Sequence, residues 1–73
     1  MNIEVYTKPS CPFCINTKMF LQSMGLEYTE IRIGKDISRE EFLEKFPEAR
    51  TVPWTLIDGN LIGGYESVKA FYA

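Results

Sequence analysis

The chain has 73 residues, enough for one small domain (residues 1–73) and near the lower limit for a core that folds unaided. Its apolar fraction of 45% and charged fraction of 25% are those of a globular protein. A net charge of -2 argues against general nucleic-acid binding, and no apolar run approaches the ~20 residues of a membrane span. The first residues lack a signal-peptide pattern, so we expect a cytoplasmic protein.

A first strand is predicted over residues 2–7. Ile3 and Val5 then lie on one face, and Glu4 and Tyr6 on the other. The run is too short for its periodicity to decide, but its place before a long helical pattern supports the prediction.

A helix is predicted over residues 12–24. Pro12 suits the first helical position, because its fixed φ fits there and its missing N–H would be unpaired in any case. Gly25 is the expected C-terminal stop. The side chains at helical spacing that should face a core are Thr17, Phe20, Leu21 and Met24.

Residues 27–33 are predicted to form a second strand, because their side chains alternate between two faces of different character. One face carries Thr29, Ile31 and Ile33, and we expect this face to be the more buried one. The opposite face carries Tyr28, Glu30 and Arg32. Strand, helix and strand at this spacing predict a right-handed parallel crossover.

The second helix has a marked beginning. Ser38 and Glu41 form a capping box, and Ile37 and Phe42 are placed for a hydrophobic staple. Phe42, Leu43 and Phe46 make the apolar stripe, and Pro47 ends the helix. The charged side chains form either a solvated face or a partner-binding surface: Arg39, Glu40, Glu41, Glu44 and Lys45.

The last third of the chain predicts a hairpin and a short helix. A third strand covers residues 54–57, a turn covers residues 58–60, and a fourth strand begins at Leu61. Gly63-Gly64 permits unusual backbone angles or a close approach to a ligand. The final helix carries Glu66 in its first turn and Val68 and Phe71 on its apolar face, and it stops at Ala73.

The only two cysteines form a C-x-x-C motif, Cys11-Pro12-Phe13-Cys14, at the junction of the first strand and helix. This pattern is typical of a thiol redox site. Cys11 would be the helix N-cap, where the helix dipole and the nearby Lys8 favour its thiolate, the attacking species. The chain has no histidine, which excludes a Cys–His pair. We therefore expect Cys11 to attack and the shielded Cys14 to resolve.

Three other interpretations of the cysteines compete. A structural zinc site normally needs four ligands, which two cysteines without histidine do not complete. A structural disulfide across so short a loop constrains the unfolded chain little. Two unrelated buried thiols do not account for Pro12 and the helix start. The redox interpretation is favoured over all three, and no metal is expected.

The sequence resembles the glutaredoxins over nearly its whole length. The resemblance rests on three motifs in order: residues 8–14 (KPSCPFC), Thr51-Val52-Pro53 and Gly63-Gly64. It implies an α/β, thioredoxin-like fold with a four-stranded mixed sheet in the order 2-1-3-4 and three flanking helices. It also implies that Pro53 is cis beside the dithiol and that the Val52 backbone pairs with an extended thiol peptide.

The resemblance implies glutathione as co-substrate. Lys8 and Arg50 would bind its glycyl carboxylate, and Thr51 to Pro53 would hold its cysteinyl part. Its γ-glutamyl end would meet Gly64, Tyr65, Glu66 and Ser67, and Phe13 would lie against it. Residues 65–67 depart from the usual family pattern of a small residue and then Asp, and Phe13 and Trp54 stand where many members have Tyr and Gln.

The implied function is glutathione-dependent reduction of protein disulfides and glutathione mixed disulfides by a monomer. The alternative is a redoxin that supplies electrons to ribonucleotide reductase and is recharged by thioredoxin reductase. An iron–sulfur carrier, with Cys11 thiolates of two chains holding a cluster, is a third hypothesis that Pro12 and Cys14 disfavour.

Overall fold

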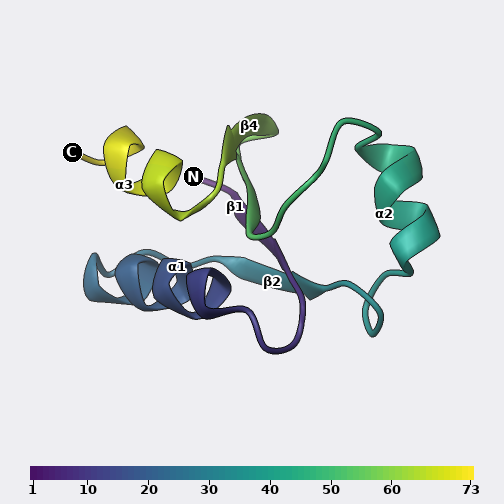
Figure 1. Cartoon of the computed structure of the whole chain (residues 1–73). Coiled ribbons are helices and arrows are strands. Elements are labelled where there is room, and N and C mark those ends of the chain that lie inside the picture. Colours follow the sequence, from purple (N-terminus) through teal and green to yellow (C-terminus); the bar gives the residue numbers. More distant parts are fainter.

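A four-stranded mixed sheet forms the centre of the computed structural model, which describes residues 1–73 (Figure 1). Its strands are β1 (Ile3–Thr7), β2 (Thr29–Arg32), β3 (Trp54–Ile57) and β4 (Asn60–Gly63). They lie in the order β2-β1-β3-β4, with β1 parallel to β2 and antiparallel to β3. The predicted order is confirmed, and the strand that leads into the cysteines is a central one.

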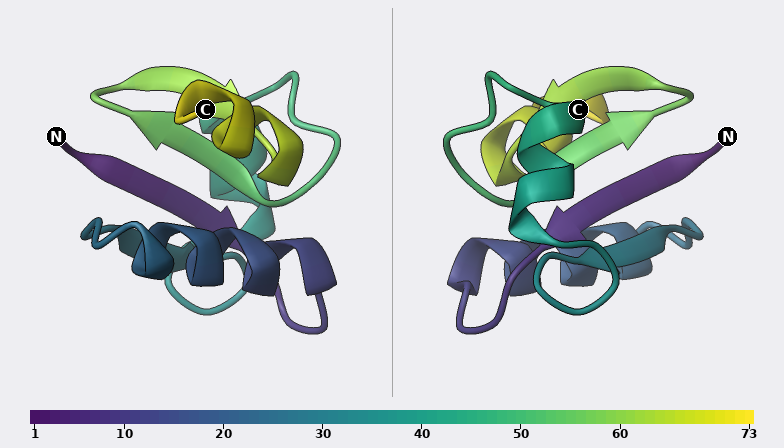
Figure 2. Two further views of the ribbon diagram at one scale, coloured as in Figure 1. Left: turned by 90° about the vertical axis from the view of Figure 1, so that its left-hand side faces the viewer. Right: turned by 90° about the vertical axis from the view of Figure 1, so that its right-hand side faces the viewer.

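Helices cover both faces of the sheet. Helices α1 (Pro12–Ser23) and α3 (Tyr65–Phe71) lie against one face, and α2 (Arg39–Lys45) lies against the other (Figures 1 and 2). Neighbouring residues of the central strands therefore both reach a core, since strand side chains alternate between faces. Ile3 and Val5 point toward α1 and α3, whereas Tyr6 points toward α2.

The core on the α2 side is aromatic. Tyr6 contacts Phe42 with ring centroids 5.2 Å apart, and Phe46 with centroids 5.3 Å apart. Trp54, whose role the sequence did not indicate, completes this cluster at 6.3 Å from Phe42 and 5.7 Å from Phe46. Packing of these rings holds α2 against the sheet next to the Thr51–Pro53 segment.

Two side chains predicted to be buried are exposed. Met24 is 47% exposed because α1 ends at Ser23 and Met24 is its C-cap, beyond the last turn that packs on the sheet. Phe71 is 49% exposed, and its neighbour Tyr72 packs against the core instead. The Met24 prediction was wrong because α1 ends one residue before it, and the Phe71 prediction was wrong because Tyr72, the C-cap of α3, takes the place against the core beside Phe20. Thr17 and Leu21 are fully buried, as predicted.

The burial of β2 also differs from the prediction. Thr29 is exposed, although it shares a face with the half-buried Ile31. Glu30, predicted on the more exposed face, leaves only 18% of its side chain accessible, because α1 covers that side of the strand. This partly buried carboxylate becomes part of the site described below.

The predicted capping box and hairpin are confirmed, except that Asn60, predicted to lie in the turn, is the first residue of β4. The Glu41 amide donates to Ser38 Oγ at 3.0 Å, and the Ser38 amide donates to Glu41 Oε1 at 3.2 Å, which completes the capping box. The hairpin has a two-residue loop, Asp58 and Gly59, with φ of 52° and 81°. Positive φ at both positions is the type I′ geometry that matches the twist of paired strands.

Gly63 is needed where β4 passes into α3. Its φ is 118°, a region that residues with a Cβ rarely adopt. A Cβ at this position would also lie 3.1 Å from Ser67 Oγ. The glycine therefore lets the chain turn sharply, which brings residues 64–67 back toward the cysteines.

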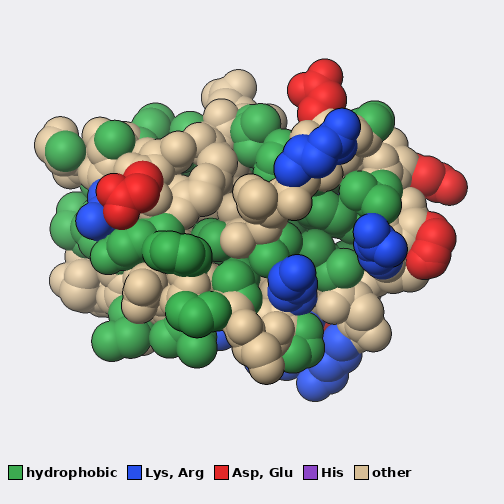
Figure 3. Space-filling view, in the orientation of Figure 1, with side chains coloured by type: hydrophobic (Ala, Val, Ile, Leu, Met, Phe, Trp, Pro, Cys, Tyr) green, Lys and Arg blue, Asp and Glu red, His purple; other side chains and the backbone are tan.

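Charge is unevenly distributed over the surface. In the face shown in Figure 3, Lys and Arg side chains gather over the half of the molecule that holds α2, with acidic side chains at its outer edge. The uneven distribution is notable because acidic residues outnumber basic ones, ten to eight.

Candidate active site

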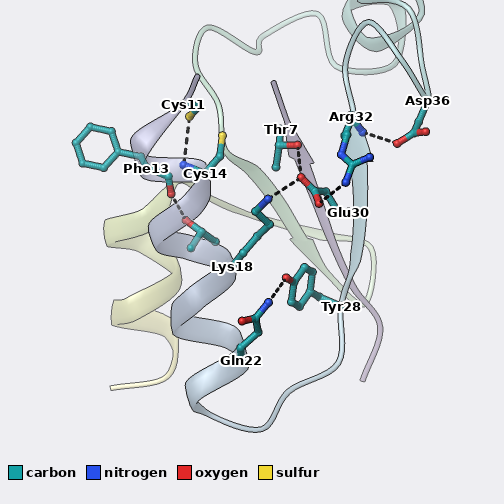
Figure 4. Close-up of polar contacts among 11 residues, drawn as sticks. Thr7, Cys11, Phe13, Cys14, Lys18, Gln22, Tyr28, Glu30, Arg32 and Asp36 are labelled. Atoms are coloured by element: carbon teal, nitrogen blue, oxygen red, sulfur yellow. Dashed lines mark hydrogen bonds and ion pairs between the residues drawn. The ribbon is translucent and has the colours of Figure 1, made fainter. Parts of the chain in front are cut away.

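Cys11 is the N-cap of α1, as predicted. Its backbone is extended, with φ of -110° and ψ of 103°, and Pro12 occupies the first helical position. The Cys14 amide donates to Cys11 Sγ at 3.2 Å (Figure 4). An amide donor and the positive end of the helix both favour negative charge on this sulfur. Cys11 is 8% exposed, so most of the residue is covered by the surrounding chain.

Cys14 is shielded by the first turn of the helix. It is 2% exposed. Burial raises the pKa of its thiol from 9.0 to about 12, and the hydrogen bond with Cys11 acts in the same direction. The Lys8 amide and the Lys18 charge partly oppose this increase. At neutral pH Cys14 is therefore a thiol, which suits a cysteine that resolves rather than attacks.

A polar network lies behind the dithiol (Figure 4). Lys18 follows Cys14 by one helical turn, and its Nζ lies 3.0 Å from Glu30 Oε2 on β2. The same oxygen accepts from Thr7 Oγ1 at 2.8 Å, and Arg32 lies 3.6 Å from Glu30 Oε1. Three partners converge on one carboxylate, so Glu30 holds the Lys18 ammonium on the side of the dithiol.

Glu30 makes the free energy of unfolding depend on pH in the acid range. Burial acts to raise the pKa of its carboxyl, but the Thr7 hydrogen bond and the Lys18 charge outweigh burial and lower it below 4.5. A folded-state pKa below the unfolded value stabilises the fold above pH 4.5, and this contribution is lost as pH falls through the folded value. We expect the free energy of unfolding of the Glu30→Gln variant to fall less between pH 7 and acid pH than that of the unaltered chain, because the variant has no carboxylate to protonate at this position.

A matched control for this measurement is Glu27→Gln, which removes an exposed carboxylate just before β2. That variant should keep the acid dependence of the unaltered chain. An identical pH slope in Glu30→Gln and the unaltered chain would contradict the structural role given to the Glu30 network.

The Thr51–Pro53 segment lies beside the attacking sulfur. Cys11 Sγ is 3.8 Å from the Val52 carbonyl oxygen. The Val52–Pro53 peptide bond is cis, as the family resemblance implied. Long-range folding thus places two motifs that are forty residues apart in the sequence within contact distance of each other.

Two hollows meet at Thr51 and Val52. The first has a volume of about 340 Å³, and the second about 300 Å³. Together they contain every residue predicted to contact glutathione. The first is lined by Phe13, Thr51, Val52, Pro53, Gly64, Tyr65, Glu66 and Ser67, and the second includes Lys8, Arg50, Thr51 and Val52.

Residues 65–67, which depart from the usual family pattern, line one side of the first hollow, where the Tyr65 ring lies near Phe13. The rings of Phe13 and Tyr65 have centroids 6.4 Å apart. Lys69 lies over the Tyr65 ring at 4.5 Å and pairs with Glu66 at 3.4 Å. No side chain caps the start of α3 at Gly64. This hollow therefore offers two rings, exposed backbone amides and one exposed carboxylate.

Arg39 was assigned from the sequence to a solvated face or a partner surface, and its site role was missed. In the structure Arg39 lines the second hollow together with Lys8 and Arg50. The apolar side chains of Phe42 and Leu43 line the same hollow. A signal was present, since Arg39 precedes Phe42 by three residues and Leu43 by four, which is the same helical face. Three cations around one hollow suit a carboxylate ligand.

Comparison with known proteins identifies the family. The glutaredoxin family model matches residues 3–62. Over 72 residues the chain is 36% identical to glutaredoxin 3 of Escherichia coli strain K12, which covers 99% of this chain and 87% of the relative. The chain belongs to the glutaredoxin family. Glutaredoxins are thiol–disulfide oxidoreductases, and this chain carries the dithiol of that enzyme class at Cys11 and Cys14.

Solved structures support the same conclusion. A buckwheat glutaredoxin in complex with glutathione superposes on this glutaredoxin with a TM-score of 0.78 and 28% identity. The match covers 96% of this chain and 66% of the buckwheat chain. A thioredoxin-like protein gives a TM-score of 0.77 and 33% identity over 96% of both chains. The predicted thioredoxin-like fold is confirmed.

No group of three or more His, Cys, Asp or Glu side chains in this glutaredoxin is placed to hold a metal ion. None of its helices is long and apolar enough to cross a bilayer.

Proposed function

We propose that this glutaredoxin uses glutathione to reduce protein disulfides and glutathione mixed disulfides. The observation that carries the proposal is that the two hollows beside Cys11 meet at Thr51 and Val52 and contain all ten expected glutathione contacts. The buckwheat relative binds glutathione with the same fold.

The chemistry of the two hollows matches the two ends of glutathione. Its cysteinyl part would pair with the Val52 backbone, within reach of Cys11 Sγ. Its glycyl carboxylate would enter the hollow of Lys8, Arg39 and Arg50. Its γ-glutamyl amine and carboxylate would meet Glu66 and the backbone from Gly64 onward in the other hollow.

Reduction of a protein disulfide takes two exchanges. The Cys11 thiolate bonds to one substrate sulfur, the substrate S–S bond breaks, and the other substrate sulfur leaves and takes a proton from water. Cys14 then loses its proton, and its sulfur bonds to Cys11 Sγ and displaces the second substrate thiolate. Two electrons have passed to the substrate, and the enzyme holds a Cys11–Cys14 disulfide.

Glutathione restores the dithiol. One glutathione thiolate opens the Cys11–Cys14 bond and forms a mixed disulfide on Cys11, and a second removes it as glutathione disulfide. Reduction of a glutathionylated protein uses Cys11 alone and does not form the Cys11–Cys14 disulfide. Cys11 takes the glutathionyl group, the protein thiol is released, and a further glutathione frees Cys11.

A redoxin recharged by thioredoxin reductase is the second candidate. The thioredoxin-like structure that matches 96% of this chain at 33% identity favours it. In that case the dithiol chemistry is the same, and ribonucleotide reductase is the expected electron acceptor. The cytoplasmic location and the monomeric state stay predictions.

A coupled assay separates the two candidates. The enzyme is given a small mixed disulfide with glutathione, glutathione reductase and NADPH, and the oxidation of NADPH is followed by absorbance. The glutathione system is then replaced by thioredoxin reductase. We expect turnover with glutathione and none with thioredoxin reductase alone.

Turnover only with thioredoxin reductase would overturn the glutathione proposal and leave Lys8, Arg39 and Arg50 as surface charges. Absence of turnover with both systems, together with visible absorbance of the freshly isolated protein, would instead favour the cluster carrier.

A further inference from the structure

A third hollow lies beside the dithiol, away from the glutathione hollow of residues 64–67. It has a volume of about 390 Å³ and shares no residue with that hollow. Both cysteines line it, and so do Lys18 and Glu30. Figure 4 shows that Phe13 points away from this side, where Lys18, Glu30 and Arg32 lie. The hollow is here named the basic groove.

The basic groove is cationic although the whole chain is acidic. Lys8, Lys18, Arg32 and Lys35 line it, which are four of the eight basic residues, and Glu30 is the only one of the ten acidic residues there. Lys18 and Arg32 share Glu30 as partner, so their charges are partly neutralised. Lys8 and Lys35 are exposed and form no ion pair in the structure.

The basic groove lies where a polypeptide substrate can extend beyond its disulfide. Because Cys11 and Cys14 both line it, a polypeptide whose disulfide is attacked by Cys11 must extend beyond the sulfurs on some side. The other two hollows would be used by glutathione in the later exchange. Ile15, which is 51% exposed at the rim of the groove, offers the backbone and side chains of such a segment an apolar contact.

We infer that the basic groove binds an acidic segment next to the disulfide of the protein substrate. The inference deepens the proposed function and rests on it, because it names the class of protein disulfide that is reduced fastest. The physical reason is charge complementarity: opposite charges at exposed positions raise the rate of encounter and penalise partners of the wrong sign. Lys35 is an exposed cation that has no ion-pair partner and lines neither glutathione hollow, so it is free to pair with a substrate carboxylate, whereas Lys8 also lines the hollow proposed for the glycyl carboxylate of glutathione.

The test uses three synthetic peptides that carry the same intrachain disulfide. Their flanking residues are two aspartates, two serines or two lysines. The pre-reduced enzyme is mixed with each peptide in a single turnover, so that the rate does not depend on the source of electrons. Rates are measured at low and at high salt, because the attraction between exposed charges is screened by ions.

We expect the aspartate peptide to react about tenfold faster than the lysine peptide at low salt, with the serine peptide between them. The difference should shrink at high salt. The Lys35→Gln variant should lose about threefold in rate on the aspartate peptide and little on the serine peptide. Lys45→Gln, which removes the same charge from the last turn of α2 and lies outside the groove, is the matched control and should behave as the unaltered enzyme.

The outcomes distinguish this inference from the function on which it rests. Equal rates for the three peptides would overturn the inference and leave the oxidoreductase function intact. A preference for the aspartate peptide that is unchanged in Lys35→Gln, or lost equally in Lys45→Gln, would overturn the assignment to the basic groove. Failure to reduce any of the peptides would count against reduction of protein disulfides itself.

Discussion

Replacement of Cys11 by serine is expected to abolish turnover of both mixed disulfides and protein disulfides, by roughly 10³-fold or more. Every route starts with the Cys11 thiolate, and a serine hydroxyl does not ionise at neutral pH to replace it. Cys14 does not take over the attack, because burial raises the pKa of its thiol to about 12. The measurement is the glutathione-coupled assay with each substrate.

Loss of activity in the Cys11→Ser variant should not be caused by unfolding. Serine is a favoured N-cap residue, and its oxygen can accept the Cys14 amide that now donates to sulfur. We therefore expect the variant to unfold within a few degrees of the unaltered protein. A folded variant that keeps more than a small fraction of the activity would contradict the assignment of Cys11 as nucleophile.

Replacement of Cys14 by serine is expected to divide the two activities. Removal of glutathione from a glutathionylated substrate needs Cys11 alone, so its rate should stay within about threefold of the unaltered enzyme. Reduction of a protein disulfide needs Cys14 to displace the substrate from Cys11, and that rate should fall by roughly 10²-fold. Both rates are measured on one preparation, with a glutathionylated peptide and a disulfide peptide as substrates.

The division depends on the geometry around Cys11 remaining unchanged. The hydrogen bond to Cys11 Sγ comes from the backbone amide of residue 14, which the substitution leaves in place. An equal loss of both activities would show that Cys14 supports the Cys11 thiolate rather than resolving the intermediate. Trapping of the substrate on Cys11 as a stable mixed disulfide would be the direct sign of a missing resolving thiol.

Several features of this glutaredoxin follow from short stretches of sequence. Pro12 and Cys11 set the start of α1, Ser38 and Glu41 set the start of α2, and Asp58-Gly59 sets the hairpin, all as expected. Each of these features is formed by residues within three positions of one another. The attacking and resolving roles that we propose for the cysteines likewise follow from their places before and within the first helical turn.

The remaining features depend on which element covers which face. Glu30 is partly buried because α1 lies over that side of β2, and Arg39 lines the same hollow as Lys8 and Arg50 because α2 presents one face to the Thr51–Pro53 segment. Met24 is exposed because α1 ends before it, and Phe71 is exposed because the neighbouring Tyr72 packs against the core in its place.

The chemistry of the dithiol is therefore a local property of the sequence, since Cys11 is the N-cap of the helix and Cys14 lies within its first turn. The surroundings of the dithiol are not local. The two glutathione hollows and the basic groove are assembled from β1, α1, β2, α2 and the segments around Val52 and Gly64, which meet only when the sheet forms. Contacts between such distant segments depend on packing over both faces of the sheet, and periodicity along the chain does not specify how those faces are paired.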